Sequence, residues 1–335
     1  MSSVIKSIKF DIFLKKKIRM AELLELKKID KEYFKDKNPV AVIGFFDGVH
    51  LGHRKILESC IKKAKKIKGV SIVLTFNKPP LNVIKSELSK KLIIPYEEKI
   101  KIIDGLGIGY IVTANFDSDF LMMEPDKFCR NILIGKFQIK EIFVGSRFRF
   151  GFKAKGDIKF LKSFLKPYDI KVNVVPLLKI KNEVVSSTNI RKYYSQGKIK
   201  DIKKLLGRDP QVEGIVVKGA GRGRQLGFPT ANIDIYEIFV TPKDGVYLGT
   251  VEIIGSRCKP LPAIINVGDN PTFKESKKWI EAFIINFTGN IYQRKIKISF
   301  LKRLRDEIVF ESKDKLINRM KLDLKYAGKY FKVKI

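Results

Sequence analysis

The sequence predicts a chain of two domains. The first is an α/β domain, a parallel sheet with helices on both faces, and the second is a small antiparallel β-barrel with a C-terminal helix. Three observations lead to this prediction. The chain of 335 residues is long for one domain. Short apolar runs alternate with helix-patterned segments up to residue 206. From residue 211 onward, short apolar runs are separated only by turns. We place the boundary between residues 1–208 and 209–335.

Five apolar runs indicate the strands of the first domain, at residues 40–43, 70–76, 110–112, 141–144 and 170–175. Helices are expected between them and after them, at residues 96–106, 158–165, 190–195 and 200–206, near Pro125, and where Ile56, Leu57, Cys60, Ile61, Ala64 and Ile67 share one face. Residues before Pro39 carry no usable motif. Ligands of parallel sheets bind at the carboxyl ends of strands, so His50 and Gly145 are expected at that edge.

The second domain is expected to follow a linker turn at residues 207–210. Its predicted strands are residues 212–217, 245–254, 261–267, 279–287 and 295–301. The final helix, residues 313–324, places Leu316, Ile317, Met320 and Leu324 on one face.

Charge and composition limit the function classes. The net charge of +33 favours non-specific adhesion to polyanions at low salt, but no basic stripe interleaved with aromatic residues stands out, so we expect no specific nucleic-acid partner. No apolar run is long enough for a membrane helix and no signal-peptide pattern is present, so no membrane partner is expected. Cys60, Cys129 and Cys258 are isolated and odd in number, which fits a reducing cytoplasm.

The junction Gly44-Phe45-Phe46-Asp47-Gly48-Val49-His50-Leu51-Gly52-His53 joins the first strand to a helix. Unpaired N–H groups at the start of a helix attract anions. His50 and His53 are the only histidines in the chain and lie on one helical face, where they can donate hydrogen bonds to a phosphate. A pair of surface or metal-binding histidines is the alternative, although no third ligand accompanies them.

Two later segments also suit phosphates. Residues 185–191 place hydroxyl groups at a helix start and a cation one turn into the helix, although an ordinary capped helix has the same pattern. Residues 219–232 are rich in glycine, whose backbone N–H groups can converge on an anion, although such loops are often only basic surface. Thr230 and Asn232 in that segment offer the oxygen ligands that Mg²⁺ prefers.

Together these motifs resemble the bacterial family of bifunctional riboflavin kinases/FAD synthetases, also called FMN adenylyltransferases. Residues 50–53 resemble the HxGH motif of Rossmann-like nucleotidyltransferases, and residues 186–191 resemble SSTxIR. Residues 223–232 resemble the GRxLGFPTAN signature of riboflavin kinases. Residues 144–151 resemble VGxDFxFG, and residues 305–310 resemble R-x-E-x-x-F. The resemblance covers roughly residues 38–325.

The resemblance implies an activity for each domain. The barrel would phosphorylate riboflavin with ATP to give FMN, and the α/β domain would transfer AMP from a second ATP to FMN, giving FAD and pyrophosphate. Riboflavin, FMN and ATP are thus the expected partners, with Mg²⁺ as cofactor. We expect a cytoplasmic monomer or weak homo-oligomer.

The resemblance also implies roles for individual residues. The catalytic residues would be His50, His53, Arg191 and, as general base, Glu281. ATP would contact Gly44, Phe46, Asp47, Gly52, Ser187, Thr188, Gly219, Gly221, Arg224, Gly227, Pro229 and Thr230. Flavins would contact Asp117, Gly145, Arg147, Phe148 and Arg305, and Mg²⁺ would be held by Thr230 and Asn232.

Three positions of the first domain depart from the family pattern: Phe45 replaces an asparagine, Pro79 replaces a histidine, and Arg147 replaces an acidic or amide residue. They motivate one alternative, a riboflavin kinase whose N-terminal domain is inactive or uses another acceptor. A second alternative, favoured only by the charge, is a non-enzymatic protein that binds flavin or nucleic acid. Identification of the flavins that form with ATP would separate these possibilities.

Overall fold

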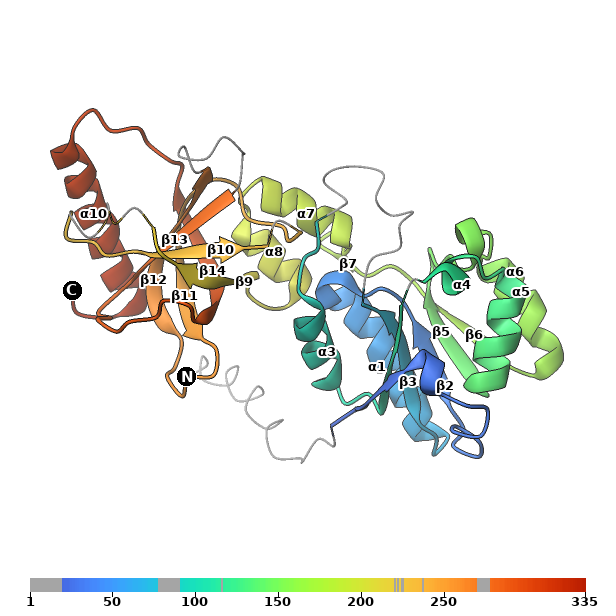
Figure 1. Ribbon diagram of the computed structural model, residues 1–335. Helices are drawn as coiled ribbons and strands as arrows, with labels where there is room; N and C mark the ends of the chain where they lie inside the picture. The colour runs from blue at the N-terminus through green and yellow to red at the C-terminus, as the bar shows by residue number, and fades with distance from the viewer. Residues whose placement is uncertain are drawn as a thin grey trace, which may run out of the picture. The chain divides into compact units, whose positions relative to one another are not determined.

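The computed structural model describes residues 20–77, 91–115, 117–219, 221, 223, 226–236, 238–269 and 278–335 (Figure 1). The chain forms two compact units. The described residues of the first are 20–45, 54–77 and most of 100–176, and those of the second lie in 46–53, 91–99 and 177–335. Because segments of the two units alternate along the chain, packing defines no single cut. The boundary at residue 208 stays a prediction.

The first unit contains the predicted parallel sheet, with six strands where five were expected. Its strands are β1 (Glu22–Glu25), β2 (Val40–Ile43), β3 (Ser71–Phe76), β4 (Tyr110–Ala114), β5 (Glu141–Gly145) and β6 (Lys171–Val175), in the order β1-β4-β3-β2-β5-β6. All four residues of β2 are buried, as expected for a central strand covered on both faces. Strand β1 was not predicted, because its sequence Glu-Leu-Leu-Glu is mostly exposed and has no apolar alternation.

The predicted helices are found to within a few residues, whereas α4 (Ser118–Leu121) and the π-helix η4 (Cys129–Lys136) were not predicted. The other helices up to residue 206 are α1 (Leu51–Lys66), α3 (Tyr96–Asp104), α5 (Pro125–Phe128), α6 (Ile158–Leu165), α7 (Ser187–Ser195) and α8 (Ile199–Leu206), with the 3₁₀ turns η1 (Leu26–Lys28), η2 (Asp47–Val49), η5 (Phe152–Ala154) and η6 (Lys166–Tyr168). On one face of the sheet, Ile43 and Leu74 pack with Phe128, Leu133 and Leu161. A short hairpin, β7 (Lys179–Ile180) and β8 (Glu183–Val184), precedes α7.

The strand order identifies the edge of the sheet where ligands are expected. Strands β3 and β4 lie on one side of β2, whereas β5 and β6 lie on the other. The connection after β2 leads to β3 on one side and the connection after β5 leads to β6 on the other, so the switch point lies between β2 and β5. Doubly wound sheets bind ligands beyond the carboxyl end of the strand at such a switch point. The segment that follows the carboxyl end of β2 is the junction with the two histidines.

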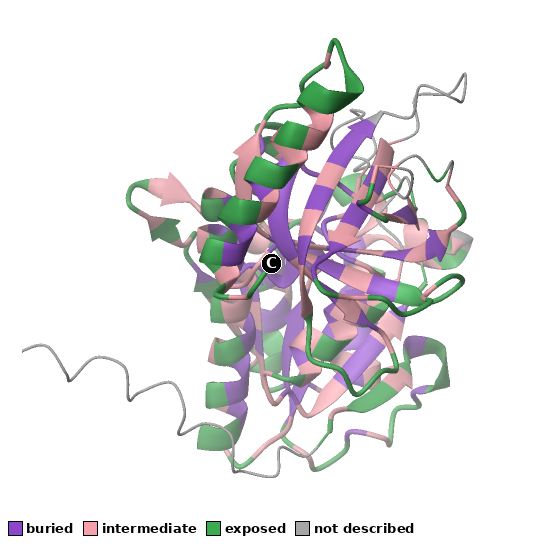
Figure 2. Cartoon of the chain, turned by 90° about the vertical axis from the view of Figure 1, so that its left-hand side faces the viewer, coloured by how far each residue is buried: buried purple, intermediate pink, exposed green. Residues whose placement is uncertain are grey.

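The second unit contains a closed antiparallel barrel, as predicted. Its strands are β9 (Gln211–Val217), β10 (Ala231–Ile235), β11 (Gly245–Ile253), β12 (Leu261–Asp269), β13 (Lys278–Ile284) and β14 (Lys295–Arg305), in the order β10-β13-β12-β11-β14-β9. Buried and partly exposed residues alternate along β9, the pattern visible as purple and pink bands on the strands of Figure 2. The sequence missed β10, because Asn232 and Asp234 interrupt its apolar residues.

The C-terminal helix α10 (Lys313–Phe331) follows the barrel and extends beyond the predicted end at residue 324. It begins at Ser312, whose hydroxyl accepts a hydrogen bond from the backbone N–H of Lys315 at 3.3 Å. Ala327 on its inner face belongs to a buried cluster with Leu248 and Ile285 of the barrel unit. The helix thus packs its apolar stripe against residues of the barrel unit.

Candidate functional site

The turn between β2 and α1 has an unusual backbone. Phe46, Gly48 and Val49 have φ angles of 53°, 79° and 35°. The left-handed region suits glycine, but a β-branched valine there is a real outlier. Such strain persists only where the surrounding structure holds it, and it is common at functional sites. The strained turn leads directly into the two histidines.

His50 and His53 lie against each other at the start of α1. Their rings are stacked, with centroids 3.5 Å apart and 15° between the planes. His50 caps the helix, because its Nδ1 accepts a hydrogen bond from the backbone N–H of His53 at 3.1 Å. The neutral His50 ring therefore carries its proton on Nε2. Gly52 leaves room for this ring, since a Cβ there would lie 3.2 Å from two of its atoms.

Both imidazoles are electrically neutral at physiological pH. Burial lowers the pKa of His50 to about 4, and the nearby Arg208 and Arg191 act in the same direction. Burial also lowers the pKa of His53 well below its usual value, with smaller contributions from His50 and Lys99. Neutral rings can donate a hydrogen bond to a phosphate from one nitrogen only.

We therefore expect that neither histidine becomes protonated between pH 7.5 and 5.5 in the folded protein. Histidine-selective NMR can check this directly, because the chain has only two such rings. In the unfolded chain both rings should titrate near their ordinary pKa of about 6.5. The unfolded state then binds protons first, so each histidine costs about 1.4 kcal/mol of folding stability per pH unit as the pH falls from about 6.5 toward the lower pKa of the folded state. A folded-state titration near pH 6.5 would contradict the assignment.

A buried ion pair supports the same turn. Asp47 is 6% exposed and pairs with Arg191 of α7. The other carboxylate oxygen of Asp47 accepts a hydrogen bond from the backbone N–H of Ile93 at 3.0 Å, and Arg191 donates from Nε to the carbonyl of Lys91 at 2.8 Å. Burial raises the pKa of Asp47, although Arg191 opposes that shift. Asp47 and Arg191, both predicted site residues, are thus brought together from distant parts of the sequence.

The helix start at α7 lies beside this pair. Ser187 donates from its hydroxyl to the backbone carbonyl of Asp47 at 3.1 Å, whereas Ser186, not Ser187, caps the helix by accepting from the N–H of Asn189 at 3.2 Å. Thr188 is exposed. Lys99 was not predicted as a site residue, yet it is 3% exposed, and burial lowers its pKa to about 8. The positive charge of Lys99 acts to lower the pKa of both Asp47 and His53.

The remaining predicted residues of the first half lie in the first unit. Gly44 donates its N–H to the carbonyl of Leu74 at 3.1 Å. Asp117 caps α4, accepting from the N–H of Phe120 at 3.0 Å, and its pKa is lowered by Lys27. Gly145 ends β5, Arg147 is exposed, and Phe148 stacks on Phe150. Pro79 lies outside the described residues.

The barrel unit contains a cavity of about 380 Å³. Its wall is mainly apolar, and a few polar groups converge in it, as in ordinary small-molecule sites. The apolar lining is Leu226, Phe228, Val246, Ile264, Phe283, Ile308, Phe310, Leu316 and Met320. The polar lining is Thr230, Asn266, Glu281, Arg305, Glu307 and Asp323. Three predicted residues, Thr230, Glu281 and Arg305, therefore share one cavity.

Thr230 also lines a second cavity of about 460 Å³, together with Pro229, Ala231 and the segment from Phe287 to Tyr292. Its hydroxyl lies 3.3 Å from Oε2 of Glu281. Asn232 is the direct cross-strand neighbour of Glu281, and its Oδ1 accepts from the indole N–H of Trp279 at 2.9 Å. Thr230 thus joins two cavities, with a carboxylate beside it.

The glycines of this segment fit closely around these side chains. A Cβ on Gly219 would lie 2.1 Å from Nδ2 of Asn232, and one on Gly223 would lie 3.1 Å from the hydroxyl of Thr230. Gly221 and Gly227 have φ angles of 73° and 81°. Arg224, predicted to bind ATP, lies outside the described residues.

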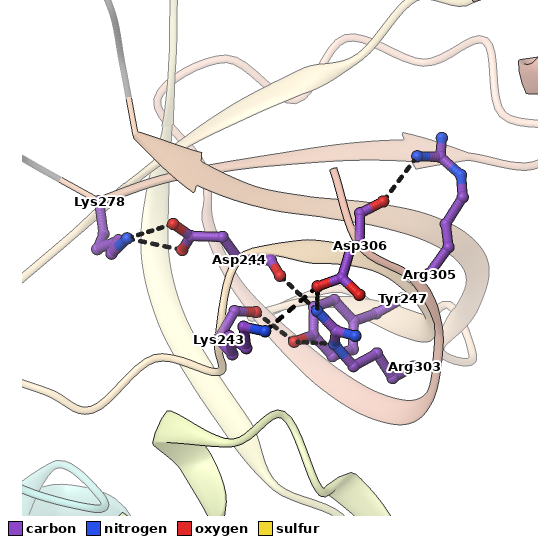
Figure 3. A network of polar contacts seen from close by, with 7 residues as sticks. All are labelled: Lys243, Asp244, Tyr247, Lys278, Arg303, Arg305 and Asp306. Carbon is purple, nitrogen blue, oxygen red and sulfur yellow. Dashed lines mark hydrogen bonds and ion pairs between the residues drawn. The ribbon is translucent and has the colours of Figure 1, made fainter. Parts of the chain in front are cut away.

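Arg305, which lines the first cavity, is linked through Asp306 to a network of polar side chains (Figure 3). Its Nε and Nη2 bind the buried Asp323 of α10 at 2.9 and 2.8 Å, and its Nη1 donates to the carbonyl of Asp306 at 3.1 Å. Arg303 in turn binds the carboxylate of Asp306 and the carbonyl of Asp244, both at 2.7 Å. Arg303 and Lys243 lower the pKa of Asp306 to about 2. Arg305 is thus held in place by Asp323 and by the backbone of Asp306.

Sequence reasoning missed several groups of this cavity. Asn266 lies opposite Glu281 on β12 and donates to Glu307 at 3.3 Å, and Asp323 holds Arg305 from α10. Glu307 lies within the motif at residues 305–310, but nothing in the sequence marks Asp323, which is one more charged residue in a helix. Among the described residues, no cluster of three or more His, Cys, Asp or Glu side chains could hold a metal, which leaves His50 and His53 without a third ligand there.

Known protein families match both halves of the chain. Residues 33–189 match the family model described as FAD synthetase, and residues 206–331 match the one described as riboflavin kinase. A bifunctional riboflavin kinase/FMN adenylyltransferase from Buchnera aphidicola subsp. Schizaphis graminum is 38% identical, covering 88% of this chain and 95% of the relative. The chain belongs to the bifunctional riboflavin kinase/FMN adenylyltransferase family.

Other members of this family are also similar. The Escherichia coli K12 protein of the same name is 30% identical, with 87% of this chain and 92% of the relative covered. A crystal structure described as a macrolide-efflux protein from Streptococcus pneumoniae shares the fold at a TM-score of 0.80 and 29% identity, covering 91% of this chain and 98% of that one. Within the described residues, no helix has the length and apolarity needed to cross a bilayer.

Both halves of the bifunctional chain therefore carry the domain expected for one of the two activities. This supports the bifunctional interpretation over the alternative of a riboflavin kinase whose N-terminal domain is inactive or uses another acceptor.

Proposed function

We propose that this chain makes FAD from riboflavin in two ATP-dependent steps, phosphorylation at the barrel and adenylylation at the histidine turn. The observation that carries the first step is that Thr230 and Glu281 lie 3.3 Å apart, with Thr230 lining both barrel cavities. The mainly apolar cavity suits an isoalloxazine ring, and the second cavity suits ATP. The ribityl hydroxyl would then meet the γ-phosphate beside Thr230.

Glu281 would act as the general base of the first step. Its carboxylate would accept the proton of the ribityl 5′-hydroxyl as that oxygen attacks the γ-phosphorus, and ADP would leave with the bridging oxygen. Arg305, held by Asp323, would keep the flavin end of the cavity ordered. Phosphoryl transfer depends mostly on positioning and charge neutralisation, which these fixed groups supply.

The barrel residues fit a magnesium ion. Thr230 and Asn232 carry hard oxygen atoms, and Gly219 and Gly223 wrap closely around them. The hydrogen bond from Trp279 orients the Asn232 amide so that its oxygen keeps a second lone pair. Thr230 and Asn232 would hold the ion, which would neutralise charge on the ATP phosphates when bound.

In the second step, the phosphate of FMN would attack the α-phosphorus of ATP and displace pyrophosphate. No general base is needed, because the FMN phosphate is already ionised. His50 would donate from Nε2–H to the phosphate whose charge grows in the transition state, and the adjacent His53 would contribute a second contact. Ser187, Thr188 and Arg191 would order the triphosphate, while Asp47 orients Arg191. Gly145, Arg147, Phe148 and Asp117 stay candidates for the flavin contacts of this step.

We further propose a cytoplasmic location, which the three isolated free cysteines support. Riboflavin, FMN and ATP would be the partners. A monomer or weak homo-oligomer and the lack of a specific nucleic-acid partner stay predictions.

The decisive experiment is one incubation of the purified chain with riboflavin, ATP and Mg²⁺, with the flavins separated by chromatography over time. FMN should appear first and FAD after it. FMN that accumulates without FAD would contradict the second step. If neither FMN nor FAD formed, the alternative of a non-enzymatic binding protein would remain.

Replacement of Gly219 by alanine should abolish FMN formation and leave FAD formation from added FMN intact. The added Cβ would lie 2.1 Å from Nδ2 of Asn232 and would push that side chain away from the metal site. Gly105→Ala is the matched control, because its Cβ would meet nothing closer than 3.4 Å. Rates of the two steps, measured separately by chromatography, check this. A Gly219→Ala protein with normal kinase activity would show that Asn232 does not hold the metal.

A further inference from the structure

Arg208 contacts the strained turn from outside the motifs considered so far. Its Nη2 donates to the backbone carbonyl of Gly48 at 2.7 Å, and its Nη1 lies 3.3 Å from the carbonyl of Val49. Arg208 follows the C-terminal end of α8 and was predicted only as part of a linker turn. One planar guanidinium therefore reaches both carbonyls immediately before His50.

These two carbonyls belong to the left-handed part of the turn. Gly48 and Val49 have φ angles of 79° and 35°, and the second is unfavourable for valine. If the two carbonyls had no partner, the turn would lower its free energy by relaxing toward ordinary backbone angles. The Arg208 guanidinium donates to two successive carbonyls and so opposes this relaxation. Any rotation of the Val49 peptide would break one of these two contacts.

The orientation of His50 depends on this turn. The residue has an extended backbone, with φ of −68° and ψ of 169°, and its Nδ1 must reach the N–H of His53 to cap α1. The Val49 carbonyl belongs to the peptide bond that precedes His50. A change in that peptide would turn the ring away from the cap and move its Nε2–H.

We propose that Arg208 is a positioning residue for adenylyl transfer, which holds the turn so that His50 presents its Nε2–H to the substrate phosphates. This inference rests on the proposed function of the histidine turn. Arg208 lies within residues 206–331, the segment that matches riboflavin kinases, and outside residues 33–189, which match FAD synthetases. A residue outside the segment that matches FAD synthetases thus serves the chemistry of that segment.

The positive charge of Arg208 has a second effect, separate from its geometry. It disfavours protonation of His50 and so helps to keep that imidazole neutral. Lysine would keep this charge but could not bridge two carbonyls with one compact ammonium group. Two replacements, Arg208→Lys and Arg208→Met, therefore separate the charge from the two-point contact.

The test measures three quantities in the full-length chain: FAD formation from FMN, FMN formation from riboflavin, and the NMR signals of the two histidine rings. In Arg208→Met, kcat for FAD formation should fall by about 10- to 100-fold, since misplacement of a reacting group by about 1 Å costs that much. FMN formation should keep its rate, the His50 pKa should rise, and its Nδ1 signal should shift as the cap is lost. Arg208→Lys should keep the low pKa of His50 and still lose most of the FAD-forming rate.

The matched control is Lys203→Met, which removes a cation from the same segment. Lys203 pairs with Asp209 at 2.8 Å in a half-exposed position, so its loss should change none of the three quantities. Wild-type FAD formation in Arg208→Met would overturn the inference, as would equal losses of both activities. If the unmodified chain makes no FAD, the proposed function itself fails. In that case the NMR signals of the histidines still show whether Arg208 positions His50. Unchanged signals in Arg208→Met would overturn the positioning role of Arg208.

Discussion

Glu281→Gln should reduce the rate of FMN formation by about 10²- to 10⁴-fold, the usual contribution of general acid–base catalysis. Glutamine has the same shape and can still accept the hydrogen bond from Thr230, so the local structure should persist. It cannot take a proton from the ribityl hydroxyl. The rate of FMN appearance from riboflavin and ATP checks this, and FAD formation from supplied FMN should stay normal.

Glu252→Gln is the control for this replacement. Glu252 lies on β11 of the same barrel and pairs with Lys297 at 2.9 Å, outside the residues that line either cavity. It should retain both activities. If Glu281→Gln kept more than a small fraction of the kinase rate, the carboxylate would not be the base, and its role would be limited to orienting Thr230.

His53→Ala should abolish FAD formation while FMN formation continues. The loss removes one of two stacked rings and a donor to the phosphates, and loss of such a donor costs about 10²- to 10³-fold in kcat. His50→Asn provides a sharper form of the same test. Asparagine can cap α1 in place of the imidazole Nδ1, so the helix should keep its stability. It cannot place a donor where Nε2–H lies, so FAD formation should still fail.

These histidine variants have the kinase activity of the same chain as their internal control. Chromatography of the flavins gives both rates, and thermal unfolding shows whether the fold has changed. A folded variant in which both activities fall together would mean that the two chemistries share one site. A His50→Asn protein with normal FAD formation would show that the imidazole only caps the helix.

The sequence by itself determined the class of both domains and most of their elements. Apolar strands such as Val40–Ile43 and helices such as α6 can be predicted from the local sequence, because their periodicity is a property of consecutive residues. The motifs around His50 and Thr230 were also recognisable, since close spacing along the chain sets which groups can meet. Strands β1 and β10 were missed, because polar residues break their patterns and pairing with neighbouring strands stabilises them.

Only the tertiary structure decided which of these groups meet. Asp47 pairs with Arg191, Thr230 lies beside Glu281, and Arg208 reaches the turn at Gly48, all across long stretches of sequence. A buried charge needs a partner, but no local pattern states which one the fold will supply. The low pKa of His50 likewise comes mainly from burial, which depends on packing by residues distant in the sequence. Short sequence motifs thus indicate the type of chemistry, whereas the geometry of the site follows from the folding of the whole chain.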